Sequence, residues 1–379
     1  MKVAVVSPEF PPDIGGIETY AIEFCRELLR QGHEVTVFTQ RHPEGEITLP
    51  GLRVVPGLSF AQDADERLFA AHPADIWHPL NAAYAWIALT GRPTVVSVHG
   101  NDFLGTYLPM APFSLERLPI LWRYAGRLRR SLLPLWLRRS QKLLTRALPR
   151  ASHILANSRF TEAALLAQIP ACRGKTSAAY VGVSERFFAV EHVAREGAPA
   201  RLLSVCRLAE QRKNIDLVLH ALARLKDRYD FEYVIAGDGH LRASLEQLAD
   251  NLGLSGRVRF RGRVSDAELL DLYAGADLFV LAASIIPGSH EGFGIVYLEA
   301  AASGVPSLAA RLAGAAEAVG EGKSGFFVDQ PDENAIANAL GHFLSGTIRF
   351  DSATCREFAR QFTWQRVVES ATTAYRRAI

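Results

Sequence analysis

The sequence predicts an α/β protein of two domains, each built on a parallel sheet. The first observation is the length, because 379 residues suit two domains of ordinary size. The second is an alternation of short apolar runs with helical periodicity, which begins at Lys2–Ser7 and begins again at Arg201–Val205. The third is the polar stretch Ala189–Pro199, which is typical of an interdomain linker. We expect domains over residues 1–188 and 198–362, and a terminal helix over residues 363–379.

Composition narrows the class of protein. Apolar residues make up 49% of the chain, yet no run approaches the roughly 18–20 apolar residues of a membrane span. The formal net charge of +2 argues against nucleic acid as the main partner. The four cysteines form no C-x-x-C motif, which fits a reducing cytoplasm and gives no sign of a structural metal. The apolar start MKVAVV is too short for a signal peptide and predicts a strand.

The first domain begins with a βαβ unit. The strand Lys2–Ser7 leads into a loop rich in proline and glycine, and apolar residues at helical spacing predict a helix over Glu18–Gln31. Glu34–Thr39 is the next strand, so the glycines of the loop lie at a strand-to-helix turn. The G-x-G-x-x-G fingerprint is absent, and the pair Gly15-Gly16 alone fits an ordinary tight turn equally well.

Two further strands, Ala74–His78 and Pro93–Val98, precede a histidine. His99 follows the second strand directly, and the carboxyl ends of parallel strands are where open α/β sheets bind ligands. A lone histidine here is either part of a site or a structural residue. Further along, Ala151–Asn157 is predicted as a strand and Arg159–Ala167 as a helix.

The segment from Arg117 to Arg150 carries ten basic residues and no acidic residue, with Leu, Ile and Trp between them. This pattern describes an amphipathic helix or helix pair at a membrane interface. The alternative is a domain-surface helix with an arginine-rich solvated face. The first interpretation makes an anionic membrane surface a partner, contacted by cations that include Arg127, Arg129 and Arg130.

The second domain repeats the alternation, and its first loop carries two cations. Arg207 follows the strand Arg201–Val205, and Lys213 opens a predicted helix over Ile215–Arg228. Such cations can converge on a diphosphate, Arg as a bidentate fork and Lys as a point charge. The alternative is two ordinary surface cations. The elements expected after them are strands at Glu232–Ala236, Val258–Gly262 and Gly325–Val328, and helices at Leu241–Leu252, Ser265–Gly275, Asp332–Leu344 and Thr354–Arg360.

The stretch Ser284–Pro306 predicts the principal binding site. It follows an apolar run, Ala276–Ala283, that is typical of a buried parallel strand. A turn-rich loop then leads through Gly292-Phe293-Gly294 into a helix over Ile295–Ser303. A strand, a glycine loop and a helix direct free backbone N–H groups at an anion, and the helix dipole adds about half a positive charge. The glycines let a phosphate approach the backbone closely.

Two acids frame this predicted anion site. Glu291 precedes the helix, and Glu299 lies about one and a half turns into it. A carboxylate beside a phosphate is unfavourable unless it faces hydrogen-bond donors such as sugar hydroxyls. The two acids can therefore hold the two ends of a ligand with phosphates in its middle, as in a nucleotide sugar. Taken singly, Glu291 could instead be a solvated loop residue and Glu299 a helix-surface acid.

The segment EGFGIVYLEAAASGVP, residues 291–306, resembles the E-x7-E segment of the retaining glycosyltransferases of family 4. Supporting segments from Val3 to about Thr363 occur in the family's order, namely a GG turn, an H-G pair at His99 and R-L-x4-K-N from Arg207. The wording EGFGIVYLEA is most similar to the phosphatidylinositol-mannoside mannosyltransferase type. Cys206 departs from the glycine usual in the family, which puts only local backbone geometry in question.

The resemblance implies a GT-B fold, in which two Rossmann-like domains with parallel sheets face a central cleft. It further implies that residues 363–379 pack back on the first domain, which binds the acceptor. The second domain would bind the donor, a GDP- or UDP-linked sugar, with no other cofactor and no metal. The family's catalytic positions map onto His99 and Glu291. Its donor-binding positions map onto Gly16, Arg207, Lys213, Val264, Gly292, Phe293, Gly294 and Glu299.

The resulting hypothesis is a retaining, metal-independent hexosyltransferase that moves mannose from GDP-mannose to a lipid-linked or glycan acceptor. The leaving diphosphate oxygen would take the proton of the incoming hydroxyl, and Glu291 would hold the sugar. We expect a cytoplasmic protein, peripheral at the inner face of the cell membrane. Two alternatives are a sugar-nucleotide epimerase or hydrolase of the same fold, and a non-catalytic sugar-nucleotide-binding partner of a membrane glycan-assembly complex.

Overall fold

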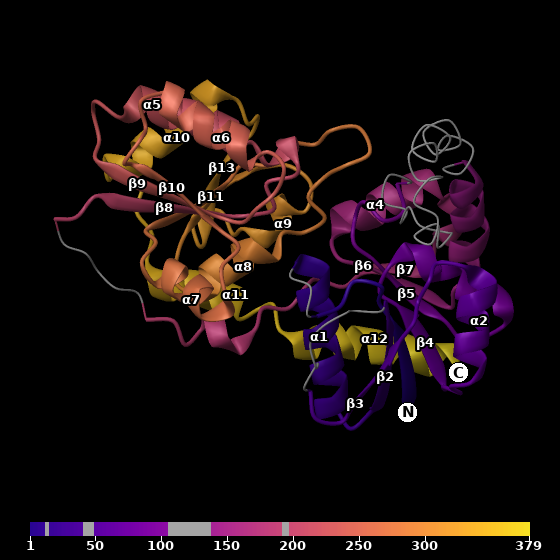
Figure 1. Ribbon diagram of the computed structural model, residues 1–379. Coiled ribbons are helices and arrows are strands. Elements are labelled where there is room, and N and C mark those ends of the chain that lie inside the picture. Colours follow the sequence, from indigo (N-terminus) through magenta and orange to yellow (C-terminus); the bar gives the residue numbers. More distant parts are fainter. Residues whose placement is uncertain (12–14, 41–48, 105–137, 192–196) are drawn as a thin grey trace, which may run out of the picture. The chain divides into compact units, whose positions relative to one another are not determined.

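The computed structural model describes residues 1–11, 15–40, 49–104, 138–191 and 197–379, and it divides into two compact units (Figure 1). Unit 1 consists of Met1–Gly182 and Trp364–Ile379, and unit 2 of Val183–Thr363. Within the described ranges every strand pairing in the sheets is parallel, as the sequence predicts.

The chain leaves unit 1 earlier than the sequence suggests. It enters unit 2 at Val183, so the polar stretch Ala189–Pro199 is not the boundary and the expected limit at residue 188 is too late. The reason is packing. Phe187 is fully buried, and the guanidinium of Arg356 donates to the carbonyls of Phe188 and Val190 at 2.9 and 2.6 Å, which holds this stretch on unit 2.

The sheet of unit 1 has two parts that meet at β4 and β5, where Trp77 forms a parallel bridge with Thr94. The first part has the order β3-β2-β1-β4 and the second the order β5-β6-β7. The strand order reverses between β1 and β4, which is where open α/β sheets bind ligands. The strands are β1 (Lys2–Val6), β2 (Glu34–Thr39), β3 (Leu52–Pro56), β4 (Ile76–Pro79), β5 (Val95–Val98), β6 (His153–Ala156) and β7 (Thr176–Ala178).

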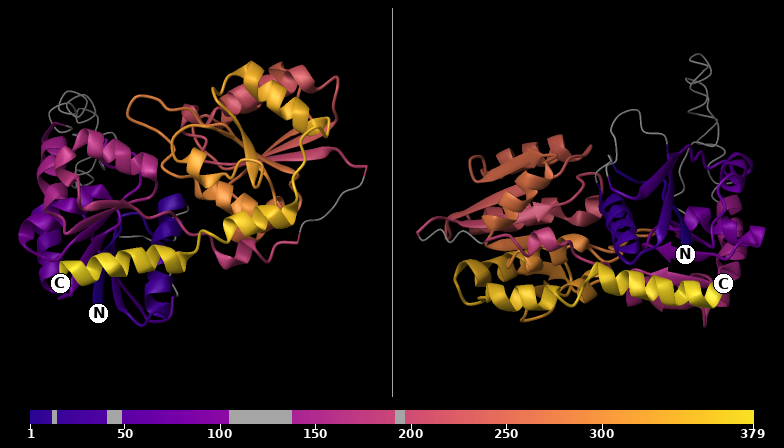
Figure 2. Two further views of the ribbon diagram at one scale, coloured as in Figure 1. Left: turned by 180° about the vertical axis from the view of Figure 1, so that it is seen from behind. Right: turned by 90° about the horizontal axis from the view of Figure 1, so that it is seen from below.

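The helices of unit 1 include one from the far end of the chain. Helix α12 (Trp364–Ala378) packs against α1, β5 and β6, and the views in Figure 2 show it running along unit 1. Its start lies against Gly182, where a Cβ atom would be only 2.6 Å from the backbone nitrogen of Trp364. The other helices are α1 (Gly16–Arg30), α2 (Gln62–Ala70), the 3-10 helix η1 (Ala82–Thr90), residues 138–147, η3 (Leu148–Arg150), α4 (Arg159–Gln168) and η4 (Pro170–Cys172).

Unit 2 is a six-stranded sheet of order β10-β9-β8-β11-β12-β13, whose order reverses between β8 and β11. Helices α5, α6 and α10 cover one face, and α7, α8 and α11 cover the other (Figure 1). The strands are β8 (Ala200–Val205), β9 (Phe231–Ala236), β10 (Val258–Gly262), β11 (Leu278–Leu281), β12 (Ser307–Ala310) and β13 (Gly325–Val328). The helices are η5 (Glu185–Phe187), η6 (Gln211–Lys213), α5 (Ile215–Leu225), α6 (Arg242–Asn251), α7 (Asp266–Ala274), α8 (Ile295–Ala302), α9 (Ala315–Ala318), α10 (Glu333–Leu344) and α11 (Ser352–Ala359).

The basic segment is only partly within the described ranges. Arg127, Arg129 and Arg130 lie outside them. In the described part, residues 138–150, Leu144 and Leu148 are buried in the core of unit 1, whereas the basic side chains are exposed. The apolar face of residues 138–150 therefore packs into the core of unit 1, and the basic face is open to solvent. This arrangement agrees with the alternative interpretation, a surface helix with an arginine-rich solvated face. None of the helices in the described ranges combines the length and apolar content that a membrane crossing requires.

Candidate active site

All the residues predicted to bind the donor except Gly16 belong to unit 2, and several of them gather at the carboxyl edge of its sheet. Arg207 and Lys213 follow β8, and Glu291 with the loop Gly292–Gly294 follows β11. These two strands are hydrogen-bonded neighbours at the point where the strand order reverses. Loops that follow two such strands diverge and leave a crevice between them. The topology therefore explains how Lys213 and Glu291 meet although they are 78 residues apart in sequence.

Lys213 and Glu291 are in direct contact. The Lys213 Nζ lies 2.5 Å from Oε2 of Glu291, and Nη1 of Arg212 lies 3.2 Å from the same oxygen. The Glu291 side chain is only 13% exposed, so the alternative of a solvated loop residue is wrong. Burial alone would raise the pKa of Glu291, but the charges and hydrogen bonds of Lys213 and Arg212 outweigh it and hold the pKa at about 2. Glu291 is therefore ionised at neutral pH.

Arg212 is the member of this cluster that sequence analysis missed. Its side chain is 5% exposed, and its guanidinium also contacts Oε2 of Glu210 at 2.6 Å and Oγ of Ser289 at 3.0 Å. Burial lowers the pKa of Arg212, but Glu291 and Glu210 outweigh this and keep it above its ordinary value. The signal in the sequence was the charged run Glu210–Lys213, where an acid precedes two cations in a loop already assigned to the site.

The glycine loop is shaped by two close contacts. Gly294 caps α8 at φ 91° and ψ 72°, a left-handed conformation that favours glycine, and a Cβ there would lie 2.5 Å from the ring of Tyr297. Gly314, which the sequence analysis did not single out, packs directly against the backbone of this loop. Its N–H donates to the carbonyl of Glu291 at 3.0 Å, and a Cβ there would lie 2.1 Å from the carbonyl oxygen of Gly292.

Phe293 contributes to the core rather than to a binding surface. Its side chain is 1% exposed and its ring lies 5.7 Å from that of Phe362. Tyr297, three residues into α8, donates to the carbonyl of Leu281 at 2.6 Å and thereby fixes the helix against β11. A donor phosphate would thus meet the backbone of this loop, since its one large side chain points into the unit.

Glu299 is also buried, which excludes the alternative of a helix-surface acid. It is 5% exposed and accepts a hydrogen bond from Oη of Tyr273, on α7, at 3.1 Å. Burial raises the pKa of Glu299 to about 7, and the Tyr273 hydrogen bond and the charge of Arg186 offset only part of that rise. Glu299 therefore carries a proton much of the time at neutral pH.

Val264 is the residue expected near the base of the donor. It lies between the end of β10 and Ser265, the serine that caps α7.

The pKa of Glu299 predicts a pH dependence of donor binding. Donor hydroxyls that hydrogen-bond to the Glu299 carboxylate would lower its pKa, so binding releases a proton. Affinity should therefore weaken as pH falls through about 7, by up to about tenfold per pH unit, and level off above it. Calorimetry with an intact nucleotide sugar measures this, because its diphosphate has no group that titrates near pH 7. Glu299→Gln should bind more weakly at pH 8 and lose the dependence; an unchanged slope would contradict the assignment.

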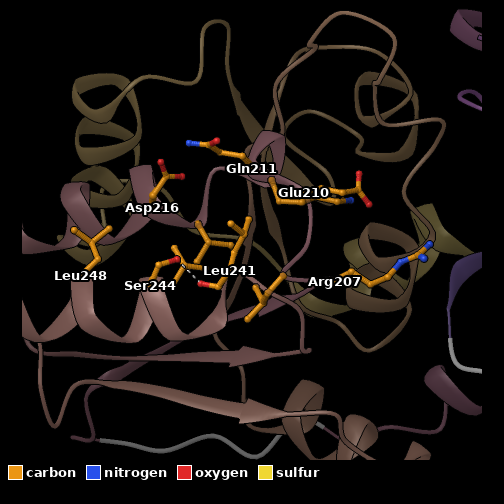
Figure 3. A pocket seen from close by; sticks show the side chains of 11 residues that line it. Arg207, Glu210, Gln211, Asp216, Leu241, Ser244 and Leu248 are labelled. Atoms are coloured by element: carbon orange, nitrogen blue, oxygen red, sulfur yellow. Dashed lines mark hydrogen bonds between the residues drawn. The ribbon is translucent and has the colours of Figure 1, made fainter. Parts of the chain in front are cut away.

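Arg207 borders a hollow on the same side of unit 2. Together with Lys213 and Glu210 it lines a cavity of about 280 Å³ whose apolar lining includes Leu241 and Leu245. In Figure 3 the side chains of Arg207 and Glu210 lie toward one end of this cavity, and those of Asp216 and Leu248 toward the other. Arg207 is exposed, so it is accessible to a ligand from solvent.

The backbone beside Arg207 is held by the turn after β9. A Cβ at Gly237 would lie 1.8 Å from the carbonyl oxygen of Cys206, and one at Gly239 would lie 2.3 Å from that of Leu208. The N–H of Leu208 donates to the carbonyl of Asp238 at 2.9 Å. The two glycines therefore serve close packing of one loop on another, and Cys206 is accommodated without disturbing it.

Unit 1 places two predicted residues at the carboxyl edge of its own sheet. Gly16 opens α1, and no atom lies within 4 Å of the position a Cβ would take there. His99 follows β5, and its ring packs edge-on against Tyr20 of α1, with 4.6 Å between ring centroids. The carboxylate of Asp102, another residue that the sequence analysis did not assign, accepts the N–H groups of His99 and Ala82 at 2.9 Å each and fixes this loop.

His99 is neutral at physiological pH. Burial lowers its pKa to about 4, and a hydrogen bond to the carbonyl of Leu80 offsets only part of that. Its Nε2 is buried and has no hydrogen-bond partner among the described residues. Since the hydrogen bond to Leu80 uses the other ring nitrogen as donor, Nε2 carries a lone pair that can accept a hydrogen bond from a hydroxyl group.

The site of unit 2 suits a sugar nucleotide, because it combines a buried carboxylate held by two cations with a glycine loop at the switch point of a parallel sheet. The fold and this site together define a glycosyltransferase of the GT-B type. Residues 14–187 match the family model Glycosyltransferase Family 4, and residues 188–362 match Glycosyl transferases group 1. The chain belongs to this glycosyltransferase family, as the sequence resemblance implies.

Curated relatives share most of their length with this chain. It is 30% identical to a GDP-mannose-dependent alpha-(1-6)-phosphatidylinositol monomannoside mannosyltransferase of Mycolicibacterium smegmatis, over 90% of this chain and 88% of the relative. It is 27% identical to an MMP alpha-(1->4)-mannosyltransferase of Mycolicibacterium hassiacum, over 100% and 98%.

Solved structures confirm the fold. A sucrose-phosphate synthase from Thermosynechococcus elongatus matches with a TM-score of 0.78 at 19% identity, covering 99% of this chain and 98% of that one. HepE of Anabaena, solved in complex with UDP and glucose, matches with a TM-score of 0.70 at 20% identity, covering 98% and 99%.

Proposed function

We propose that this glycosyltransferase is a retaining, metal-independent hexosyltransferase that takes mannose from GDP-mannose and transfers it to a lipid-linked or glycan acceptor. The observation that carries the proposal is the ionised, largely buried Glu291 beside the glycine loop of α8. Support for this donor comes from the two relatives described above, which are both named as mannosyltransferases, the first of them as GDP-mannose-dependent.

The site supplies charge where the reaction needs it. In the proposed mechanism Arg207, Lys213 and the backbone N–H groups that begin α8 neutralise the charge that develops on the leaving diphosphate. One diphosphate oxygen takes the proton of the attacking hydroxyl on the face from which the diphosphate departs, which gives retention. The carboxylate of Glu291 stabilises the positive charge that develops on the sugar. Nε2 of the neutral His99 accepts a hydrogen bond from a sugar hydroxyl, and Glu299 accepts hydrogen bonds from the ribose hydroxyls.

A panel of labelled nucleotide sugars, with and without membrane lipid extract, tests this proposal. We expect label from GDP-mannose to appear in lipid or glycan, with retained anomeric configuration by NMR and with unchanged rate in a chelator. A change of the donor alone would indicate an epimerase or hydrolase, and no change at all would indicate a binding protein. Label that appears only from UDP-linked sugars would overturn the proposed donor.

The acceptor and the location are part of the same proposal. A relative of 30% identity is named for a phosphatidylinositol monomannoside acceptor, which is a lipid. The basic segment Arg117–Arg150 has no acid, and in its described part Arg138, Arg139 and Lys142 are exposed. We therefore place the protein peripherally on the anionic cytoplasmic leaflet, where such cations attract it.

Flotation with liposomes checks this placement. Binding should need anionic lipid and fall as salt rises, because screened charges attract less. With about 1 kcal/mol per cation near the surface, changing Arg127, Arg129 and Arg130 to Glu should weaken binding at least tenfold. A control of equal charge change, at Arg257, Arg259 and Arg261 around β10 in unit 2, should bind as the wild type does. Binding that ignores lipid charge, or none at all, would favour a solvated surface and a soluble acceptor.

A further inference from the structure

The carboxylate of Glu291 is shared by two cations on one oxygen. Lys213 and Arg212 both contact Oε2, at 2.5 and 3.2 Å. Arg212 is the more deeply buried of the two, and its remaining nitrogens are occupied by Glu210 and Ser289, so it has little freedom to move. Lys213 has one carboxylate contact and a flexible stem, so it is the cation that can turn to another anion.

The charge balance of the cluster depends on Arg212. The formal charges of Glu210, Glu291, Arg212 and Lys213 sum to zero. The proposed function requires Lys213 to bind the diphosphate of the donor when it arrives. If Arg212 were absent, the cluster would carry one net negative charge, and Lys213 would be the sole partner of a carboxylate that is 13% exposed. Removing the partner of a buried charge is strongly unfavourable, so Lys213 would remain on Glu291.

We propose that Arg212 is a positioning residue, the resident counter-ion of Glu291 that leaves Lys213 available for the donor diphosphate. This inference rests on the proposed function. In this proposal Arg212 does not contact the substrate, because the nitrogens of its guanidinium already contact Glu210, Glu291 and Ser289.

The competing explanation is a purely structural one. Arg212 also ties two loops together, since its carbonyl accepts the N–H of Ser284 at 2.7 Å and its Nε reaches Ser289 on the same loop. On that account its loss would distort the site whatever the charge of Glu291. The two explanations therefore differ in whether neutralising Glu291 repairs the loss of Arg212.

A charge-rescue cycle separates them, with GDP and UDP as probes in calorimetry. Arg212→Gln keeps hydrogen-bonding capacity but removes the charge, and it should weaken diphosphate binding about tenfold, the effect of one charged hydrogen bond. Arg212→Lys keeps the charge but not all three contacts of the guanidinium, so it should bind the diphosphate more tightly than Arg212→Gln does. The double variant Arg212→Gln with Glu291→Gln should return to within about threefold of wild type, because neutrality is restored and Lys213 is released.

Two results would overturn the proposal: a double variant that binds as weakly as Arg212→Gln, or an Arg212→Gln protein that binds as wild type. Arg201→Met is the matched control, because Arg201 pairs with Glu232 at 3.0 Å at the start of β8, at the amino edge of the sheet, and its loss should leave binding unchanged. Wild-type protein that binds neither diphosphate would refute the proposed donor site itself. Melting temperatures of all variants show whether each remains folded.

Discussion

Replacing Glu291 with glutamine should lower turnover about 100- to 1000-fold while leaving the binding of free nucleoside diphosphate within about threefold. The carboxylate, whose pKa is held at about 2, is the negative charge proposed to face the sugar as it becomes positive. An amide of equal size keeps the shape and removes that charge. The diphosphate alone has no sugar to stabilise, so its affinity should be spared. Saturating-donor kinetics and calorimetry with the nucleoside diphosphate give the two numbers.

The matched control for this change is Glu232→Gln. Glu232 is also partly buried and paired with an arginine, Arg201, but it lies on β9 at the amino edge of the sheet. Its amide variant should turn over as wild type does. The assignment of Glu291 fails if Glu291→Gln abolishes diphosphate binding while Glu299→Ala leaves it untouched, since the roles of the two acids would then be exchanged.

Changing either Arg207 or Lys213 to alanine should lower kcat/KM about 10- to 100-fold. Each is proposed to make a charge-assisted bond to the diphosphate, which contributes about 1.5–3 kcal/mol. Lys213→Ala leaves Arg212 as the counter-ion of Glu291, and Arg207 is exposed, so both proteins should fold. Steady-state kinetics at several donor concentrations measure the effect.

Lys226→Ala is the control for the loss of a lysine in the same unit. Its Nζ donates to the carbonyl of Leu252 at 2.8 Å, away from the β8 and β11 loops, so activity should be unchanged. Turnover at the wild-type rate in both Arg207→Ala and Lys213→Ala would remove this pair from the site. A loss in Lys213→Ala alone would confine the diphosphate contact to Lys213.

Some elements could be predicted because their signals are local. Val258–Gly262 and Gly325–Val328 are strands with the expected bounds, and the capping box of Ser265 with Glu268 is present at the start of α7. Others could not. Strand β12, Ser307–Ala310, is short and half alanine, and it is a strand because it pairs with β11 on one side and β13 on the other.

The sequence by itself determined the α/β class, the two units, the glycine loop with its helix, and the residue types of a sugar-nucleotide site. These depend on periodicity, turn residues and charge that act over a few positions. Only the tertiary structure decided that Arg212 shares Glu291 with Lys213, that Gly314 supports the glycine loop, and that the chain crosses between units after Gly182. Each of these depends on strand order and close packing between segments far apart in the chain, which no local pattern records.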